Sequence, residues 1–192
     1  MSKSLNQVTQ YLIANEIEYE LRKTDQIART AQEAADGIGC HLNQIVKSII
    51  FSAPSSDSLV LFLTAGGNFV DVHKVESLLG FTLQKADAQI IRFQTGFVIG
   101  SVPPFAHKEE LAVYMDPELL NHSLIWAVAG TPFHLFSINS EVLLATTKAK
   151  TLNSVIPTSF FRWLFALPSN KLTSGIEGPC PHGSCFRLFS RP

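Results

Sequence analysis

The 192-residue sequence is poor in charged residues, and this limits the partners it can have. Charged residues make up 16% of the chain, and its formal net charge is −1. A protein that binds a DNA duplex along its phosphates is usually more basic. We therefore expect no duplex DNA partner, and we expect any contact with nucleic acid to be local, such as a strand end held by a few side chains.

Long apolar runs are also lacking. The strongest, Ser159 to Leu167, is too short to span a membrane and carries Arg162. The first residues, MSKSLNQVTQYL, have no uninterrupted apolar core of the signal-peptide type. These two absences predict that the protein does not contact a membrane.

Cysteine is scarce as well, with Cys40, Cys180 and Cys185 as the three examples. Three cysteines do not make an even disulfide framework, so we expect a reducing, cytoplasmic location. The segment CPHGSC at 180–185 offers two thiols and one imidazole, but zinc normally takes four ligands and no second cluster is present. We expect neither a metal ion nor a cofactor.

Three catalytic motifs are missing from the sequence. It contains no GxSxG, no HExxH and no GxxxxGK[ST]. A serine hydrolase with a nucleophile elbow, a zinc protease and a P-loop enzyme are therefore all disfavoured.

The residues that are present favour one compact domain. The chain is 46% hydrophobic and has 14 phenylalanines, enough for a sizeable core. Helices and strands alternate irregularly, which predicts an α/β fold with a mixed, strongly curved sheet surrounded by helices. We assign this domain to residues 1–152. Residues 153–192 lack lasting periodicity and are expected to form an irregular C-terminal tail.

The expected elements follow from capping residues and apolar periodicity. Ser4, Thr30 and Ser140 are each expected to cap a helix, and Gly80 is expected to end one. The helices are predicted over 4–15, from 30 to about 37, over 72–79, from 87 to 91 and over 140–146. The strands are predicted over 17–21, 46–51, 59–64, 111–115, 124–129 and 134–138, the second and third forming a hairpin.

The loop GFVIGSVPPF, residues 96–105, is the first candidate for a ligand contact. Glycine adopts positive φ without a Cβ penalty, whereas each proline fixes φ and has no backbone N–H. Gly100, Ser101 and their neighbours are therefore the nearby amide donors of a stiff, open loop. Such a loop suits close approach by a ligand, although a packed surface loop has the same composition.

Lys47 is the second candidate, because it interrupts the apolar strand IVKSII. It could lie on the solvent face of an edge strand. It could equally project from a rigid strand into a cleft, where an ammonium would stabilise a phosphate or a developing oxyanion.

The remaining polar candidates have structural explanations as well. His134 follows a Gly-Thr-Pro-Phe turn and could be a satisfied core or surface imidazole. Asp71 precedes a helix and Asp116 precedes Pro117, and both are capping or turn positions rather than catalytic ones.

Four segments in order resemble the YbaK/prolyl-tRNA synthetase-associated domain family. They are IVKSIIF, LTAGGNFVDVHKVESLLG, TGFVIGSVPPFAHKEELAVYMDPELL and IWAVAGTPFHLF, and the similarity covers about residues 1–152. The family consists of free-standing trans-editing deacylases related to the editing insertion of bacterial prolyl-tRNA synthetases. The resemblance implies a mixed α/β fold and hydrolysis of mischarged aminoacyl-tRNA.

The resemblance also implies roles for individual residues. Lys47 matches the family's strand lysine, and Gly100 to Pro104 match its GxxxP loop, so Lys47 and Gly100 are the expected catalytic residues. Gly130 to His134 match a GxxxH motif. Ser101, Pro104, Gly130 and His134 are the expected substrate-binding residues. In the family's usual scheme the terminal ribose hydroxyl of the tRNA helps to activate water, so no protein nucleophile is needed.

The implied partner is the acceptor end of an aminoacyl-tRNA, with prolyl-tRNA synthetase as a candidate second partner. The GTPFH loop and the apolar run before Gly100 are closer to members that clear small amino acids such as alanine from proline tRNA. The alternative is a non-catalytic paralogue that binds an aminoacyl-tRNA end or a synthetase.

Overall fold

The computed structural model describes residues 2–24, 27–53, 58–153 and 155–157. Its first half contains α1 (Lys3–Ala14), β1 (Leu21–Lys23), α2 (Ala31–Ile38), η1 (Leu42–Gln44), β2 (Ile45–Ala53), β3 (Ser58–Ala65), β4 (Asn68–Val70), α3 (Val72–Leu79) and β5 (Gln84–Lys85). The second half contains α4 (Ala88–Thr95), β6 (Ala112–Met115), η2 (Pro117–Asn121), β7 (Leu124–Val128), β8 (His134–Asn139), α5 (Ser140–Thr147), β9 (Lys150–Thr151) and β10 (Val155–Pro157).

Local capping signals set most of the helix ends. The Thr30 hydroxyl accepts a hydrogen bond from the Glu33 amide, and Gly39 ends α2 in the left-handed conformation. Asp71 caps α3 in the same way, and Gly80 ends that helix. These side chains satisfy amides that the first turn of a helix leaves without a backbone partner.

Eight of the strands form one mixed sheet in the order β1-β8-β7-β2-β3-β6-β9, with β5 also paired to β2. The predicted hairpin of β2 and β3 is confirmed, in the register Lys47 opposite Thr64. The ladders of β2 with β7, β3 with β6 and β6 with β9 are parallel, and the remaining ladders are antiparallel. A separate two-stranded ladder joins β4 to β10.

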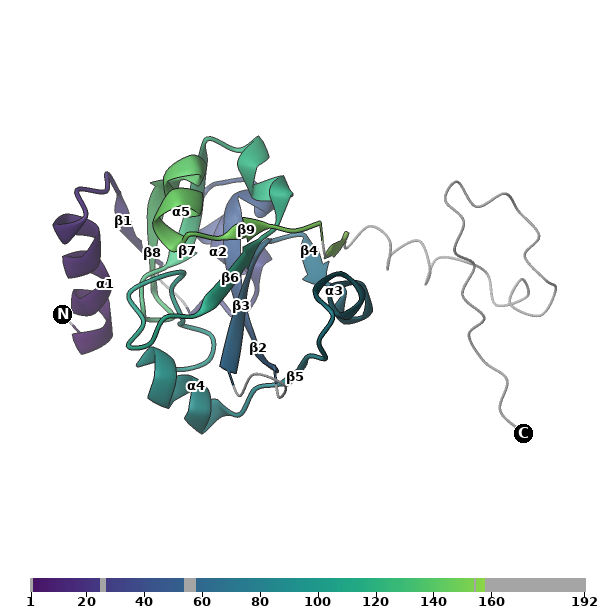
Figure 1. The fold of residues 1–192 in the computed structure, drawn as a ribbon. Coiled ribbons are helices and arrows are strands. Elements are labelled where there is room, and N and C mark those ends of the chain that lie inside the picture. Colours follow the sequence, from purple (N-terminus) through teal and green to yellow (C-terminus); the bar gives the residue numbers. More distant parts are fainter. Residues whose placement is uncertain (1, 25–26, 54–57, 154, 158–192) are drawn as a thin grey trace, which may run out of the picture. The chain divides into compact units, whose positions relative to one another are not determined.

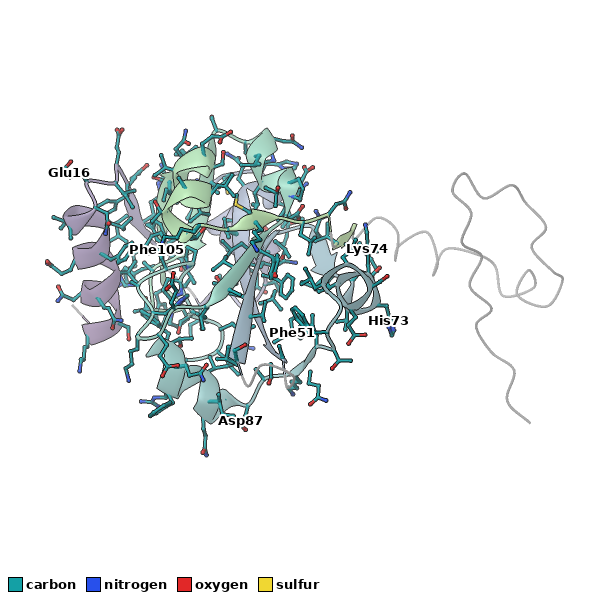
Figure 2. All side chains as sticks on the ribbon, viewed as in Figure 1. Glu16, Phe51, His73, Lys74, Asp87 and Phe105 are labelled. Carbon is teal, nitrogen blue, oxygen red and sulfur yellow. The ribbon has the colours of Figure 1, made fainter. Side chains whose placement is uncertain are left out.

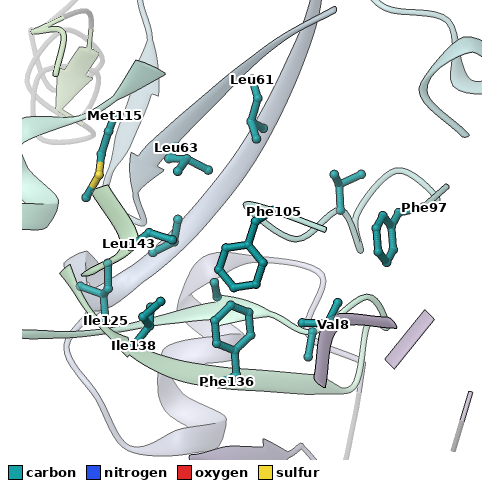
Figure 3. Packing of buried hydrophobic residues seen from close by; sticks show 14 of the residues in the cluster. Val8, Leu61, Leu63, Phe97, Phe105, Met115, Ile125, Phe136, Ile138 and Leu143 are labelled. Atoms are coloured by element: carbon teal, nitrogen blue, oxygen red, sulfur yellow. The ribbon is translucent and has the colours of Figure 1, made fainter. Parts of the chain in front are cut away.

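The sheet is covered on both faces, and α1 and α3 lie on opposite sides of it in Figure 1. On one face, Leu61, Leu63 and Phe136 pack with Val8 of α1 and Leu143 of α5. Figure 3 shows Phe105, from the loop after α4, reaching into this cluster beside Phe136. The other face has two smaller clusters, one under α2 around Trp126 and one under α3 around Phe62. Burial of these faces is the main source of stability.

Several predicted boundaries are wrong, among them the end of the helix predicted over 87–91, which continues to Thr95, and three helix or strand starts. The cap of α1 is Ser2, whose hydroxyl accepts from the Leu5 amide, and not Ser4. The cap of α5 is Asn139 and not Ser140. The first strand begins at Leu21 rather than Ile17, because only residues 21–23 pair with β8, while Ile17 is buried in the core as it leaves α1.

The mixed α/β architecture is confirmed, but the strong curvature expected of the sheet is not found in the described residues. There the end strands β1 and β9, three and two residues long, do not pair with each other, so the sheet stays open. Most of the predicted tail, residues 158–192, lies outside the described residues, and with it the CPHGSC segment. The division of the chain at residue 152 stays a prediction, and the described body continues through β10.

Candidate functional site

A break in the sheet next to Lys47 forms the candidate site. Strand β2 pairs with β7 only at Ile45 and Val46, and β5 pairs with β2 only at Phe51 and Ser52. Within the described residues, no strand therefore pairs with the intervening edge of β2. A cavity of about 250 Å³ lies along this edge. Its walls are residues 28–31, Ala34, residues 45–49, Gly100, Val102, Val128, Pro132, His134 and Leu135.

Three of the residues predicted from the sequence meet in this cavity. Lys47 comes from β2, Gly100 from the loop after α4, and His134 from the start of β8. These positions are far apart in the sequence, and the order of the strands brings them together.

Lys47 is held on the face of the sheet between the α2 and α3 clusters. Its ammonium donates a hydrogen bond to the backbone oxygen of Asn68 and lies 4.5 Å from the centroid of the Phe69 ring. Burial lowers the pKa of Lys47, and the negative charge of Asp116 acts in the opposite direction. A desolvated cation with a specific charge partner in a cavity is typical of a functional site.

Gly100 is open to a ligand. Its φ is +83°, and a Cβ at this position would meet nothing within 4 Å. Glycine is needed here for the backbone conformation, and the space beside it is unfilled. A ligand in the cavity can therefore approach the backbone of this residue closely.

Ser101 and Pro104 lie on the same loop but do not line this cavity. Ser101 is buried, and both its amide and its hydroxyl donate to the Val98 oxygen at 3.0 Å. Pro104 lines a different cavity, beside α1. The geometry gives Ser101 a role in holding the turn that presents Gly100.

His134 and Gly130 also differ in their surroundings. The Nδ1 atom of His134 is 2.7 Å from the Thr131 hydroxyl, which fixes the ring and leaves Nε2 to serve a ligand. Burial, with a contribution from nearby Lys23, lowers the pKa of His134. Gly130 lies outside the cavity, and a Cβ there would be 2.8 Å from the Ser4 oxygen and 2.9 Å from the Phe97 ring. Gly130 therefore permits α1 and Phe97 to pack closely on this turn.

Sequence reasoning missed several contributors to the site. Arg29 lines the cavity just before the Thr30 cap of α2, where it adds an exposed positive charge. Ser48 lines it next to Lys47, and its buried hydroxyl has no hydrogen-bond partner among the described residues. A basic residue directly before a helix cap was a usable signal for Arg29. Nothing in the sequence pattern distinguished Ser48 from any other strand serine.

Other kinds of site find no support in the described part of the chain. It contains no group of three or more His, Cys, Asp or Glu side chains arranged to hold a metal ion. No helix in this part combines the length and the apolarity needed to cross a membrane. Cys40 lies outside the cavity, and burial raises the pKa of its thiol.

Comparison with known proteins agrees with this geometry. The family model of the aminoacyl-tRNA editing domain matches residues 25–146. A solved structure described as a candidate trans-editing enzyme for prolyl tRNA synthetase superimposes with a TM-score of 0.73 and 35% identity, covering 80% of this chain and 97% of that one. The chain belongs to the aminoacyl-tRNA editing domain family.

Two curated relatives are more distant in sequence. The uncharacterised protein YwhH of Bacillus subtilis is 28% identical over 114 residues, which is 59% of this chain and 72% of that protein. A proline–tRNA ligase of Thermoanaerobacter sp. is 28% identical over 136 residues, which is 67% of this chain but only 24% of the ligase. The similarity therefore extends to one part of the ligase.

Proposed function

We propose that this protein is a trans-editing deacylase that hydrolyses the ester of a mischarged aminoacyl-tRNA, with alanine on proline tRNA as its main substrate. The observation that carries the proposal is the meeting of Lys47, Gly100 and His134 in one small cavity. Membership in the editing family and the likeness to a ligase for proline support the same assignment.

The reaction asks little of the protein beyond positioning and charge stabilisation. Water adds to the carbonyl carbon of the ester, negative charge develops on the carbonyl oxygen, and the bond to the ribose oxygen then breaks. The products are a free amino acid and a tRNA with a free terminal hydroxyl. The neighbouring ribose hydroxyl assists in activating the water. Because the ester is already reactive, holding it in place and stabilising the oxyanion supply most of the rate.

The roles follow from where the residues lie. The Lys47 ammonium stabilises charge on the phosphate and carbonyl side, and the Gly100 amide contacts the carbonyl or the terminal adenosine. His134 borders the amino-acid pocket. Gly130 acts on substrate indirectly, by holding the turn that leads to His134, and Ser101 and Pro104 shape the loop around Gly100.

The size and lining of the cavity support a small substrate. At about 250 Å³ it lies just below the usual range of ligand pockets. Apolar side chains such as Ala34, Ile45 and Leu135 form much of its wall. A pocket of this kind favours a small aliphatic side chain, although it discriminates by only about 1–3 kcal/mol per methylene.

A panel of charged tRNAs tests the proposal. The single-turnover rate is measured on alanyl-tRNA(Pro), cysteinyl-tRNA(Pro) and prolyl-tRNA(Pro), each beside a protein-free control. We expect the alanyl ester to be hydrolysed fastest. Binding of the charged tRNAs without hydrolysis of any of them would instead identify a non-catalytic paralogue.

A further inference from the structure

The ammonium of Lys47 has three N–H donors, and its neighbours among the described residues use only part of this capacity. One donor is engaged by the Asn68 oxygen, and the Phe69 ring lies against the charge. Two consecutive residues of β4 therefore fix where the ammonium lies at the cavity wall. The position of β4 then determines the position of the charge.

Strand β4 is anchored through the Asn68 side chain. Its amide nitrogen donates to a carboxylate oxygen of Asp116 at 2.8 Å. Both residues are buried, with 8% of Asn68 and 3% of Asp116 exposed to solvent. A hydrogen bond from a buried amide to a buried carboxylate is among the stronger kinds, because one partner is ionised.

Asp116 makes more contacts than a helix cap requires. One carboxylate oxygen accepts from the Glu118 amide and caps η2, as the sequence predicted. The other accepts from both Asn68 and the Ala65 amide, and the Asp116 amide donates to Leu63. These bonds fix the carboxylate at the end of β3, where Thr64 pairs with Lys47 of β2.

We propose that Asp116 and Asn68 are positioning residues that fix the Lys47 ammonium at the cavity wall. Neither lines the cavity, so both act on its contents through Lys47. Asn68 sets the geometry through its backbone oxygen. Asp116 sets the geometry through Asn68. Its negative charge also counters the effect of desolvation on the Lys47 ammonium. The kinetic part of this inference rests on the proposed deacylase activity, but the structural part does not.

Two substitutions test the two parts of this inference. Asn68→Ala removes the bond to Asp116 but leaves the backbone oxygen and the carboxylate in place. Asp116→Asn removes the negative charge at nearly the same size and replaces one of the two accepting oxygens by an NH2 group. The matched control is Asp87→Asn, since Asp87 caps α4 by the same kind of bond and lies at the outer end of that helix (Figure 2).

The first readout needs no substrate. The ¹³Cε and ¹Hε shifts of Lys47 are followed across pH and assigned by their absence in Lys47→Met. We expect Asn68→Ala to reduce the ring-current shift that Phe69 imposes on Lys47. We expect Asp116→Asn to lower the pKa of Lys47, and Asp87→Asn to change neither property.

The second readout is the single-turnover deacylation of alanyl-tRNA(Pro), with a thermal melt of each variant. We expect Asn68→Ala to lower the rate by up to about 10²-fold, the cost of misplacing a catalytic group by about an ångström. Because the charged ammonium is the active form, a lower pKa of Lys47 in Asp116→Asn moves the alkaline fall in rate to lower pH.

Unchanged Lys47 shifts and titration in a folded Asn68→Ala variant would overturn the inference, whatever happens to Asp116→Asn. If Asp116→Asn does not fold, Asn68→Ala still decides. If the wild type hydrolyses no ester, the proposed function fails while the Lys47 titration continues to test the positioning.

Discussion

The Lys47 cavity differs in its charges from another cavity of the described residues, which lies beside α1. The larger, about 590 Å³, is bounded by α1, the loop from Pro104 to Leu111 and the end of α5. Its clearest charge pair, Lys148 with Glu110 at 3.5 Å, has side chains that are 82% and 86% exposed. Exposed pairs of this kind contribute about 0–1 kcal/mol because water screens them.

The smaller cavity has less room but a more unusual charge. Its lysine is partly desolvated, hydrogen-bonded to a backbone oxygen and placed against an aromatic ring. Desolvating a cation costs stability, and a charge kept in spite of that cost is a better guide to function than the volume of a cavity. The smaller cavity, which contains Lys47, is therefore the better candidate for the functional site.

The largest effect is expected for the replacement of Lys47 by alanine, compared with the same replacement of Lys148 in the larger cavity. Lys47→Ala should lower the single-turnover rate on alanyl-tRNA(Pro) by roughly 10²–10³-fold, about 2.7–4 kcal/mol, as for loss of an oxyanion donor. Lys47→Arg should also be impaired, because a planar guanidinium places its charge differently. Lys148→Ala is the matched control and should keep the wild-type rate. Equal rates for Lys47→Ala and Lys148→Ala would remove the distinction between the cavities.

The next effect concerns Gly130, which contacts α1 of the larger cavity and leads into His134 of the smaller one. Gly130→Ala places a methyl group within 3 Å of backbone and ring atoms at a φ of +75°. We expect it to lower the free energy of unfolding by about 2–4 kcal/mol, from overpacking and strain together.

The control for this substitution is Gly39→Ala, at a φ of +73° but with nothing within 4 Å of the new Cβ. It should cost only the strain, about 1–2 kcal/mol. Chemical denaturation of both variants measures the difference. Equal losses would mean that the close contacts at Gly130 contribute nothing.

The smallest effect is a dependence of stability on pH. Because burial lowers the pKa of Lys47 in the folded protein, the unfolded chain holds this proton over a pH range in which the folded chain has lost it. The free energy of unfolding therefore rises with pH in the window between the lowered pKa and the ordinary value of 10.5. Lys47→Met lacks this contribution. Denaturation curves at several alkaline pH values should show the wild type gaining stability relative to Lys47→Met, and parallel behaviour would contradict the desolvation.

Local signals in the sequence were enough for elements whose ends are marked by single residues. The helix from Val72 to Leu79 was predicted in full because Asp71 and Gly80 mark its ends, and the hairpin of β2 and β3 because both strands are long apolar runs. The choice between Ser2 and Ser4, or between Asn139 and Ser140, depends on how each helix packs and was missed. The strands of two or three residues, such as β4, are too short to leave a periodic pattern.

The candidate site was predictable in part for the same reason. Lys47, Gly100 and His134 stand out because each breaks a local pattern, as a charge in an apolar strand, a glycine before prolines and a histidine after a turn. The residues that hold Lys47 do not stand out. Asn68 and Asp116 are 48 positions apart, and only the parallel pairing of β3 with β6 brings them together. No pattern in one sequence reports a pairing between segments so distant along the chain.

The ladder between β4 and β10 has a consequence for the order in which the site is completed during synthesis. All residues that line the Lys47 cavity lie before residue 136, so a ribosome has made them well before it reaches β10. The carbonyl oxygen that accepts a hydrogen bond from the Lys47 ammonium nevertheless belongs to Asn68 of β4. This strand pairs with β10, Val155–Pro157. A nascent chain that has emerged only to residue 153 therefore contains every residue that lines the cavity. It does not yet contain β10, the strand that pairs with β4. In the order of synthesis, the ladder with β10 is therefore a later contact of β4 than its bond to Asp116.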